Sequence, residues 1–154
     1  MKKQHRIKSK NYIYWIIGLI LIILLALLVE NLVNNTNVLS NFQLSDNYVT
    51  LVIDGDTFEI HSGESVRLIC IDTPELGDSG SYEAKEFLEG LILNKEVRLE
   101  KDISETDKYG RLLRYVYVNE SGKEVFVNKE LVQNGYADVW RYGEDVKRCG
   151  EIED

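Results

Sequence analysis

Three short polar segments hold most of the residues whose types suit metal or phosphate chemistry. They read Asp54-Gly-Asp-Thr57, Asp72-Thr-Pro-Glu75 and Asp107-Lys-Tyr-Gly-Arg111. Carboxylate oxygens bind hard cations, and arginine binds phosphate through charge-assisted hydrogen bonds. Each segment alone also has a purely structural interpretation, as a hairpin turn, a helix cap or an exposed hairpin tip.

Histidine chemistry is nearly excluded, because the chain has only two histidines. His5 lies in a basic leader and His61 lies in a turn beside Ser62 and Gly63. A single histidine outside the leader cannot build a His/Cys metal site, and there is no second one for a paired-histidine mechanism or a Ser-His-Asp triad. The chemistry that remains uses carboxylates, arginines and tyrosines.

The elements that must position these segments are short strands and two helices. Strands are predicted at 49–53, 57–60, 66–71, 97–99 and 112–118, where β-branched and aromatic residues alternate with turn signals. Apolar residues at helical spacing predict an amphipathic helix at 82–93, and a second helix is predicted at 127–134 with Gly135 as its terminator. This order favours a small mixed β-barrel plus helices.

Arg67 stands alone among apolar residues in the third predicted strand, so its side chain needs an anionic partner. Asp72 follows five positions later. On a straight strand the two residues would lie roughly 17 Å apart on opposite faces, at about 3.3 Å per residue. Their side chains can meet only if the strand bends or bulges near its end.

The N-terminal region predicts membrane insertion. Residues 1–11 form a basic leader, and residues 12–29 contain no charged side chain over a length that can span a bilayer. The positive residues before the apolar run place the N-terminus in the cytoplasm and the rest of the chain outside. We expect a single-pass anchor, with secretion after signal cleavage as the alternative. Residues 30–47 are rich in Asn, Ser and Thr and are predicted to be a polar linker.

The charge of residues 30–154, which hold the linker and the predicted domain at 48–154, argues against a broad polyanion-binding surface. The chain holds 18 basic and 26 acidic side chains; five basic ones lie in the leader, which leaves 13 against 26 and a net charge of −13. Binding of nucleic acid would therefore depend on a small arginine cluster and a metal ion. The sequence indicates no protein partner. The only cysteines, Cys70 and Cys149, fit one disulfide or two free thiols, and Cys70 in its apolar run favours a buried free side chain.

The order of the motifs resembles the staphylococcal nuclease family. Asp-Gly-Asp-Thr at 54–57 is followed by Arg67 and, after four intervening residues, by Asp72-Thr-Pro-Glu75, and then by Asp107-Lys-Tyr-Gly-Arg111. The similarity covers about residues 49 to 140, including both predicted helices. It implies an OB-fold barrel and calcium-dependent hydrolysis of phosphodiester bonds in DNA and RNA, with products that end in a 3′-phosphate.

The resemblance also implies roles for individual residues. Asp56, Asp72 and the carbonyl of Thr73 are expected to bind Ca²⁺, with water completing the shell. Glu75 is the expected general base, while Arg67 and Arg111 are expected to hold the scissile phosphate and stabilise its growing charge.

The same resemblance points to a substrate-binding set beside these residues. Lys108 and Tyr109 match the pair that contacts a terminal nucleotide phosphate, and Tyr142 is expected to pack on a base. Exposed hairpin residues are the structural alternative for Lys108 and Tyr109.

Two departures from the family stand out. Residues 76–81 form a shorter loop than the lysine-rich one of the family's best-known member, and the agreement fades after Ala137. Residues 144–154 are expected to be too short and too charged to form the family's C-terminal helix, which leaves the barrel to stand without it or with a partner's help. The alternative function is a membrane-anchored OB-fold binding or adaptor module without catalysis.

Overall fold

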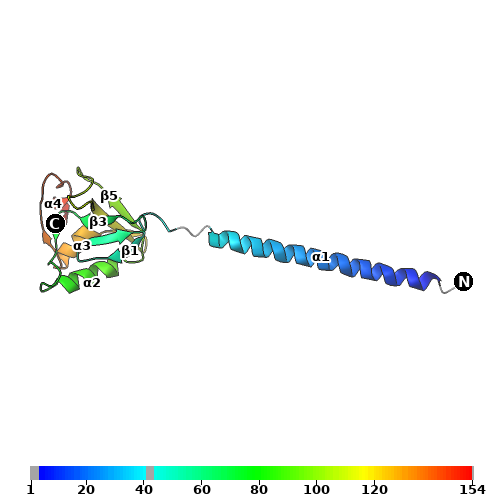
Figure 1. The fold of residues 1–154 in the computed structure, drawn as a ribbon. Helices are drawn as coiled ribbons and strands as arrows, with labels where there is room; N and C mark the ends of the chain where they lie inside the picture. Colours follow the sequence, from blue (N-terminus) through cyan, green and yellow to red (C-terminus); the bar gives the residue numbers. More distant parts are fainter. Residues whose placement is uncertain (1–3, 41–43, 154) are drawn as a thin grey trace. The chain divides into compact units, whose positions relative to one another are not determined.

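The computed structural model describes residues 4–40 and 44–153. The chain divides into two compact units, residues 1–43 and 44–154. The first contains one helix, α1 (Gln4–Ser40), shown in Figure 1. Its segment Tyr12–Val33 is long and apolar enough to cross a membrane, a property shared by signal sequences. Residues 1–3 of the predicted leader and residues 41–43 of the predicted linker lie outside the described residues.

The predicted polar linker begins inside α1, which continues to Ser40. Residues 30–40 contain neither glycine nor proline. Asparagine and serine lower helix propensity only modestly, so nothing in this stretch terminates a helix that the apolar segment has already started.

The second unit contains a mixed barrel, as predicted for the fold class. Strands β1 (Val49–Val52), β2 (Thr57–Ile60) and β3 (Ser65–Leu68) form an antiparallel meander. Strand β3 then pairs in parallel with β6 (Leu112–Glu120), which also pairs with β5 (Val97–Glu100) and β7 (Lys123–Phe126). A bridge between Tyr48 and Glu96 joins the start of β1 to β5 and closes the barrel.

The predicted strand at 66–71 is interrupted, and this interruption shapes the site. Strand β3 ends at Leu68, and a new strand, β4 (Ile71–Asp72), pairs with β8 (Asp138–Val139). Between them Cys70 has a φ of 63°, a left-handed conformation that is uncommon outside glycine. The chain therefore makes the bend that the meeting of Arg67 and Asp72 requires.

Two helices cover the barrel close to their predicted positions. Helix α2 (Ser81–Ile92) buries Ala84, Leu88 and Ile92, the apolar face that its periodicity predicts. Helix α3 (Val127–Gln133) buries Val127, Asn128 and Leu131, and Gly135 follows it with a φ of 77°. The Phe87 ring of α2 stacks on Tyr136 at 4.4 Å between centroids, which joins α2 to the segment that follows α3.

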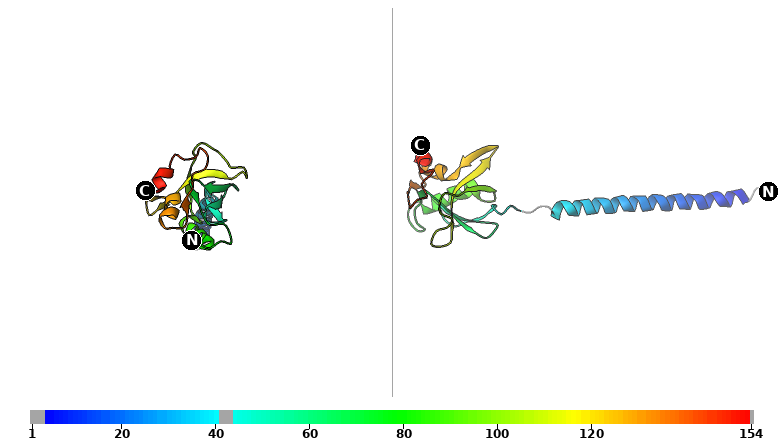
Figure 2. Two further views of the ribbon diagram at one scale, coloured as in Figure 1. Left: turned by 90° about the vertical axis from the view of Figure 1, so that its left-hand side faces the viewer. Right: turned by 90° about the horizontal axis from the view of Figure 1, so that it is seen from above.

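The C-terminal segment differs from its prediction, since it forms a short helix, α4 (Cys149–Glu153), beside α3 (Figure 2). Cys149 and Ile152 are fully buried, while Glu151 and Glu153 pair with Arg148 and Arg141 on the outside. Cys149 is also bonded to Cys70, so the prediction of a free buried cysteine is wrong. The bridge and Ile152 anchor a helix that would be too short to stand alone.

Candidate active site

The turn between β1 and β2 places a buried carboxylate against the start of α2. The Asp56 backbone N–H donates to Asp54 Oδ1 at 3.0 Å, which shapes the turn. A Cβ on Gly55 would lie 2.7 Å from Thr73 Oγ1 and 2.8 Å from Ala84 Cβ. Glycine is therefore required here because neighbouring atoms fill the space where a side chain would begin.

The Arg67 guanidinium joins both sides of the bend after β3. Its Nη1 donates to the carbonyl oxygens of Leu68 at 2.6 Å and Ile71 at 3.1 Å. Its Nη2 lies 3.0 Å from Asp56 Oδ2 and 3.0 Å from Asp72 Oδ1. The planar fork thus holds the bend closed and faces two carboxylates at once, which a lysine could not do.

Asp56 is the most deeply buried carboxylate of this cluster. Its Oδ2 accepts hydrogen bonds from Thr73 Oγ1 at 3.0 Å and from the Thr73 N–H at 3.3 Å, and its Oδ1 accepts one from Thr57 Oγ1 at 3.0 Å. Burial raises the pKa of Asp56 to about 6, with a further contribution from the charge of Asp54 and partial compensation by Arg67. A second cation beside Asp56 would favour its ionised form.

Arg111 reaches the same cluster from the tip of the 107–111 turn. Asp107 Oδ1 accepts hydrogen bonds from the N–H groups of Tyr109 and Arg111, which fixes the turn. The Arg111 Nε donates to Asp107 Oδ2 at 2.7 Å, and its Nη1 donates to Thr57 Oγ1 at 3.2 Å. Thr57 therefore links the second arginine to Asp56.

Glu75 lines a small cavity together with the cluster. The cavity has a volume of about 110 Å³ and is lined by Asp54, Asp56, Arg67, Arg111 and the residues from Thr73 to Leu76. The Glu75 side chain is exposed, and no hydrogen bond or ion pair to another described residue holds it. A carboxylate that is not engaged in an ion pair is available to accept a proton or orient a water molecule.

A larger groove of about 670 Å³ adjoins the cavity, and both Arg67 and Arg111 line the two spaces. The three predicted substrate-binding residues, Lys108, Tyr109 and Tyr142, also line this groove. The Lys108 Nζ lies 4.9 Å from the centre of the Tyr109 ring, and both tyrosine rings are largely exposed. The structure thus brings these residues next to the arginines and leaves their faces open to solvent.

The donor atoms of the cluster fit a hard cation better than any other metal. Asp54, Asp56 and Glu75 line one cavity with Thr73. Asp72 lies beside this cavity, because its carboxylate contacts the same Arg67 nitrogen as Asp56. All of these donors are oxygens, which calcium and magnesium prefer. Within the described part of the chain no three carboxylate, imidazole or thiol side chains gather tightly enough to chelate an ion. A bound cation would complete its shell with backbone oxygen and water.

Three residues of this region were not predicted as site residues. Asp54 lines the cavity, Thr57 bridges Asp56 and Arg111, and Trp140 lines the groove with over half of its surface exposed. Asp54 and Thr57 belong to the first motif, so their position in the sequence could have identified them. Trp140 carries a weaker signal, a lone tryptophan in a polar segment.

The sequence comparisons agree with this arrangement. The family described as "Staphylococcal nuclease homologue" matches residues 65–153, past the point after Ala137 where the similarity was expected to end. A thermonuclease of Staphylococcus hyicus is 36% identical over 124 residues, 75% of this chain and 71% of that protein. A thermonuclease of Staphylococcus intermedius is 41% identical over 98 residues, 58% and 56% of the two chains.

A third relative, the endonuclease YncB of Bacillus subtilis, is 39% identical over 101 residues, which cover 56% of this chain and 44% of that protein. The matched family segment contains Arg67, Asp72, Glu75 and Arg111, and the Asp-Gly-Asp turn precedes it in the same barrel. The chain therefore belongs to the staphylococcal nuclease family and is a hydrolase that acts on nucleic acids.

Proposed function

We propose that the protein is a calcium-dependent endonuclease that cleaves DNA and RNA to products with 3′-phosphates, outside the cytoplasmic membrane. The observation that carries this proposal is the convergence of Arg67, Arg111 and Glu75 on the cavity that Asp56 lines. These residues come from three separate segments of the chain. A binding module without catalysis would have no need to bring a carboxylate that lacks an ion-pair partner next to two arginines.

The two arginines are suited to hold the scissile phosphate. Both guanidinium groups already face anionic oxygens, Asp56 and Asp72 for Arg67 and Asp107 for Arg111. A phosphate entering the cavity would share these donors through charge-assisted hydrogen bonds. As phosphorus becomes five-coordinate, the additional negative charge would be stabilised by groups that the fold has oriented in advance.

Glu75 is suited to act on the attacking water. Its carboxylate lines the same cavity and is not paired with a cation, so it can accept a proton from water or orient it toward the phosphate. The 5′-oxygen would leave, as the family resemblance implies. In this scheme Glu75 contributes to the rate of the chemical step and little to substrate affinity.

Asp56, Asp72 and the carbonyl of Thr73 would hold the calcium ion. When bound, calcium would neutralise phosphate charge and polarise a phosphate oxygen. The protein's own contribution is to bury Asp56, orient it through Thr73 and Thr57, and bring Asp72 close by means of the bend. Lys108 and Tyr109 would contact a terminal phosphate, and Tyr142 would stack on a base.

Cleavage of single-stranded DNA and RNA by the full chain in detergent tests the proposal. We expect activity with Ca²⁺, none with chelator, and 3′-phosphate ends on the products. Glu75→Gln should lower kcat by about 10²-fold or more with KM little changed. Glu83→Gln is the matched control, because Glu83 is an exposed carboxylate of α2 outside the cavity. A folded wild-type protein that binds single strands without cleaving them would favour the binding module.

The display outside the membrane is also a proposal. It is supported by the apolar length of α1 and the basic residues that precede it. The full-length protein should be found in the membrane fraction. When intact cells are treated with an external protease, residues 44–154 should be degraded. Release of the domain into the medium would instead support a cleaved signal sequence.

A further inference from the structure

Part of the wall of the groove is a loop without helix or strand, residues 140–148, which we call the strap. It connects β8 to α4. Trp140, Tyr142 and the residues from Gly143 to Asp145 line the groove from this side. The strap therefore supplies part of the surface that a bound strand of nucleic acid would contact.

Both ends of the strap are fastened to one residue. At its start the Trp140 N–H donates to the carbonyl oxygen of Cys70 at 3.0 Å. Immediately after its end, Cys149 is bonded to the same Cys70 through the disulfide. Cys70 thus closes the base of the strap, with a hydrogen bond on one side and a covalent bond on the other.

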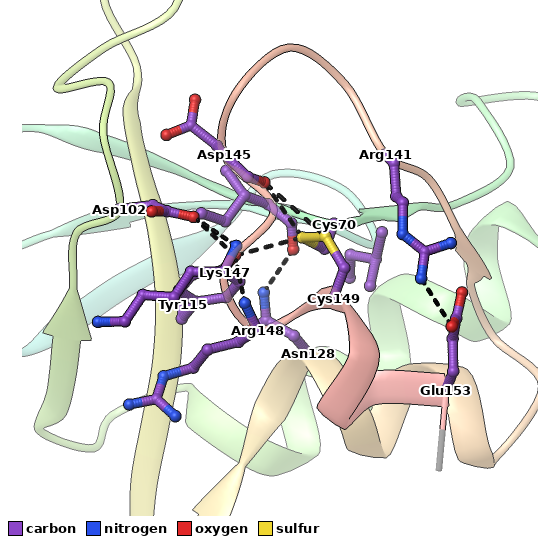
Figure 3. The surroundings of a disulfide bond; sticks show 12 residues. Cys70, Asp102, Tyr115, Asn128, Arg141, Asp145, Lys147, Arg148, Cys149 and Glu153 are labelled. Carbon is purple, nitrogen blue, oxygen red and sulfur yellow. Dashed lines mark hydrogen bonds and ion pairs between the residues drawn. A yellow bond between two sulfur atoms is a disulfide. The ribbon is translucent and has the colours of Figure 1, made fainter.

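The middle of the strap is held by non-covalent contacts, several of which Figure 3 shows. They include ion pairs of Lys147 and Arg148 with Glu100. Asp145 Oδ1 accepts from the N–H groups of Ile103 and Ser104 at 2.9 and 2.8 Å. The Lys147 and Arg148 N–H groups donate to Asp102 Oδ2 and to the Tyr115 hydroxyl. Asp145 and Tyr115 are buried, whereas the contact between Lys147 and Asp102 is exposed. The disulfide adds to these contacts a covalent restraint on the end of the strap.

The cavity with the two arginines does not depend on the disulfide. The bend around Cys70 is also held by Arg67, which donates to the Ile71 carbonyl, and by Asn128, which donates to the Ile69 carbonyl at 2.9 Å. Asn128 is fully buried and also accepts from the Val116 N–H. The bend would persist without the disulfide, whereas the strap would lose its anchor.

We propose that the Cys70–Cys149 disulfide positions the strap. Its redox state then controls the shape of the substrate groove and leaves the catalytic cluster unchanged. Reduction breaks the S–S bond, takes up two electrons and two protons, and leaves two thiols. In the cytoplasm a dithiol supplies these electrons and becomes a disulfide. Outside the cell, the two thiols of the chain pass two electrons and two protons to an external disulfide, which becomes a dithiol, and the bridge forms again. The strap opens in the reduced state, so substrate affinity falls while the chemical step is preserved.

This inference rests on the proposed nuclease function and adds a regulatory consequence. In a reducing cytoplasm the newly made chain would bind nucleic acid weakly, and it would gain affinity once the bridge forms in an oxidising environment. The cell's own nucleic acids would thereby be protected without an inhibitor protein.

The test compares the full chain in detergent before and after reduction with a phosphine, which becomes a phosphine oxide and does not chelate calcium. Thiol titration reports the redox state, and circular dichroism reports the fold. We expect KM for single-stranded DNA to rise about tenfold on reduction, the loss of roughly one stacked base, with kcat within about twofold. The Cys149→Ser variant should show the high KM with and without the phosphine.

Hydrogen exchange provides a readout that is independent of activity. On reduction the amides of residues 140–148 should lose protection while those of β6 keep it. An unchanged KM and unchanged exchange would overturn the proposal, as would a loss of kcat at constant KM or unfolding of the barrel. If the oxidised protein cleaves nothing, the proposed function fails, but the exchange experiment still decides whether the bridge positions the strap.

Discussion

The replacement of Gly55 by alanine tests the packing that holds the candidate site together. A Cβ at this position would meet Thr73 Oγ1, Thr73 Cβ and Ala84 Cβ at 2.7, 2.9 and 2.8 Å. None of these atoms lies at the end of a flexible side chain. Thr73 is buried and hydrogen-bonded to Asp56, and Ala84 is fixed in α2. Overpacking of this kind costs about 1–3 kcal/mol of unfolding free energy.

Gly90→Ala is the matched control, because it makes the same chemical change in an open position. Gly90 lies inside α2, and apart from its chain neighbours and the nearby backbone of its own helix no described atom comes within 4 Å of a Cβ built there. Alanine in a helix interior is more stable than glycine by about 0.5–1 kcal/mol. The two substitutions should therefore change stability in opposite directions.

Urea denaturation of the full chain in detergent measures both effects. In a Trp15→Phe background, Trp140 is the only tryptophan and reports on the domain. With a slope of about 1–2 kcal/mol per molar urea, Gly55→Ala should lower the midpoint by about 1 M and Gly90→Ala should raise it by about 0.5 M. A Gly55→Ala protein as stable as its parent would refute the packing argument.

The same substitution should also affect the proposed metal site. Thr73 must move away to make room for the new Cβ, and with it Asp56 loses two hydrogen bonds that orient its carboxylate. The calcium concentration needed for half-maximal cleavage should rise for Gly55→Ala and stay the same for Gly90→Ala. Equal calcium requirements in both proteins would show that the position of Thr73 does not affect the metal site.

Three further predictions concern other parts of the domain. Asn128→Ala leaves two buried backbone groups without a partner and should cost about 2–5 kcal/mol in chemical denaturation, against less than about 0.5 kcal/mol for the exposed Asn134→Ala; similar losses would contradict the role of the buried amide. Although burial alone would raise it, hydrogen bonds from the Ser104 and Ile103 backbone hold the pKa of Asp145 below its usual range. Its contribution is thus fully present above the unfolded pKa of about 3.9 and is lost as the pH falls through the lower folded value, so the stability advantage over Asp145→Asn should decline as the pH falls below about 4. An advantage that is as large at pH 2 as at pH 7 would argue against this assignment. Lys108→Gln should reduce the slope of log affinity for single strands against log salt by about 0.7, whereas Lys123→Gln on β7 should not; equal slopes would show that Lys108 contacts no phosphate.

The helices of the domain follow closely from local sequence patterns. The apolar residues of α2 recur at helical spacing, and its observed ends lie within one residue of the predicted ones. Helix α3 ends one residue before its predicted end, and Gly135 takes the positive φ that terminates a helix. These features depend on neighbours in the chain, which is why periodicity and turn residues suffice to predict them.

The meeting of Arg67 and Asp72 could not be derived from spacing. A straight strand would separate them, and the bend depends on a positive φ at Cys70, a residue that rarely adopts it. The conformation is maintained by a distant partner, Asn128 of α3, which donates to the Ile69 carbonyl. Only the family resemblance, which brings a whole fold with it, predicted the convergence.

The disulfide and the C-terminal helix escaped prediction for a similar reason. Cys70 and Cys149 are 79 positions apart, and the charged residues near Cys149 hide the single apolar face that Ile152 completes. Helix α1 extends into the predicted polar linker, because residues 30–40 contain no glycine or proline to end a helix that the apolar segment has started.

The parallel pairing of β3 with β6 has a consequence for how the chain becomes folded. Val66 must find Leu112 across an intervening crossover that includes α2 and β5. Such non-local closure is slow compared with helix or hairpin formation, so we expect it to limit the folding rate. Until it occurs, one edge of β3 is open to pairing with strands of other chains. The interval between the emergence of residues 68 and 114 is therefore when the protein is most exposed to aggregation and to proteases.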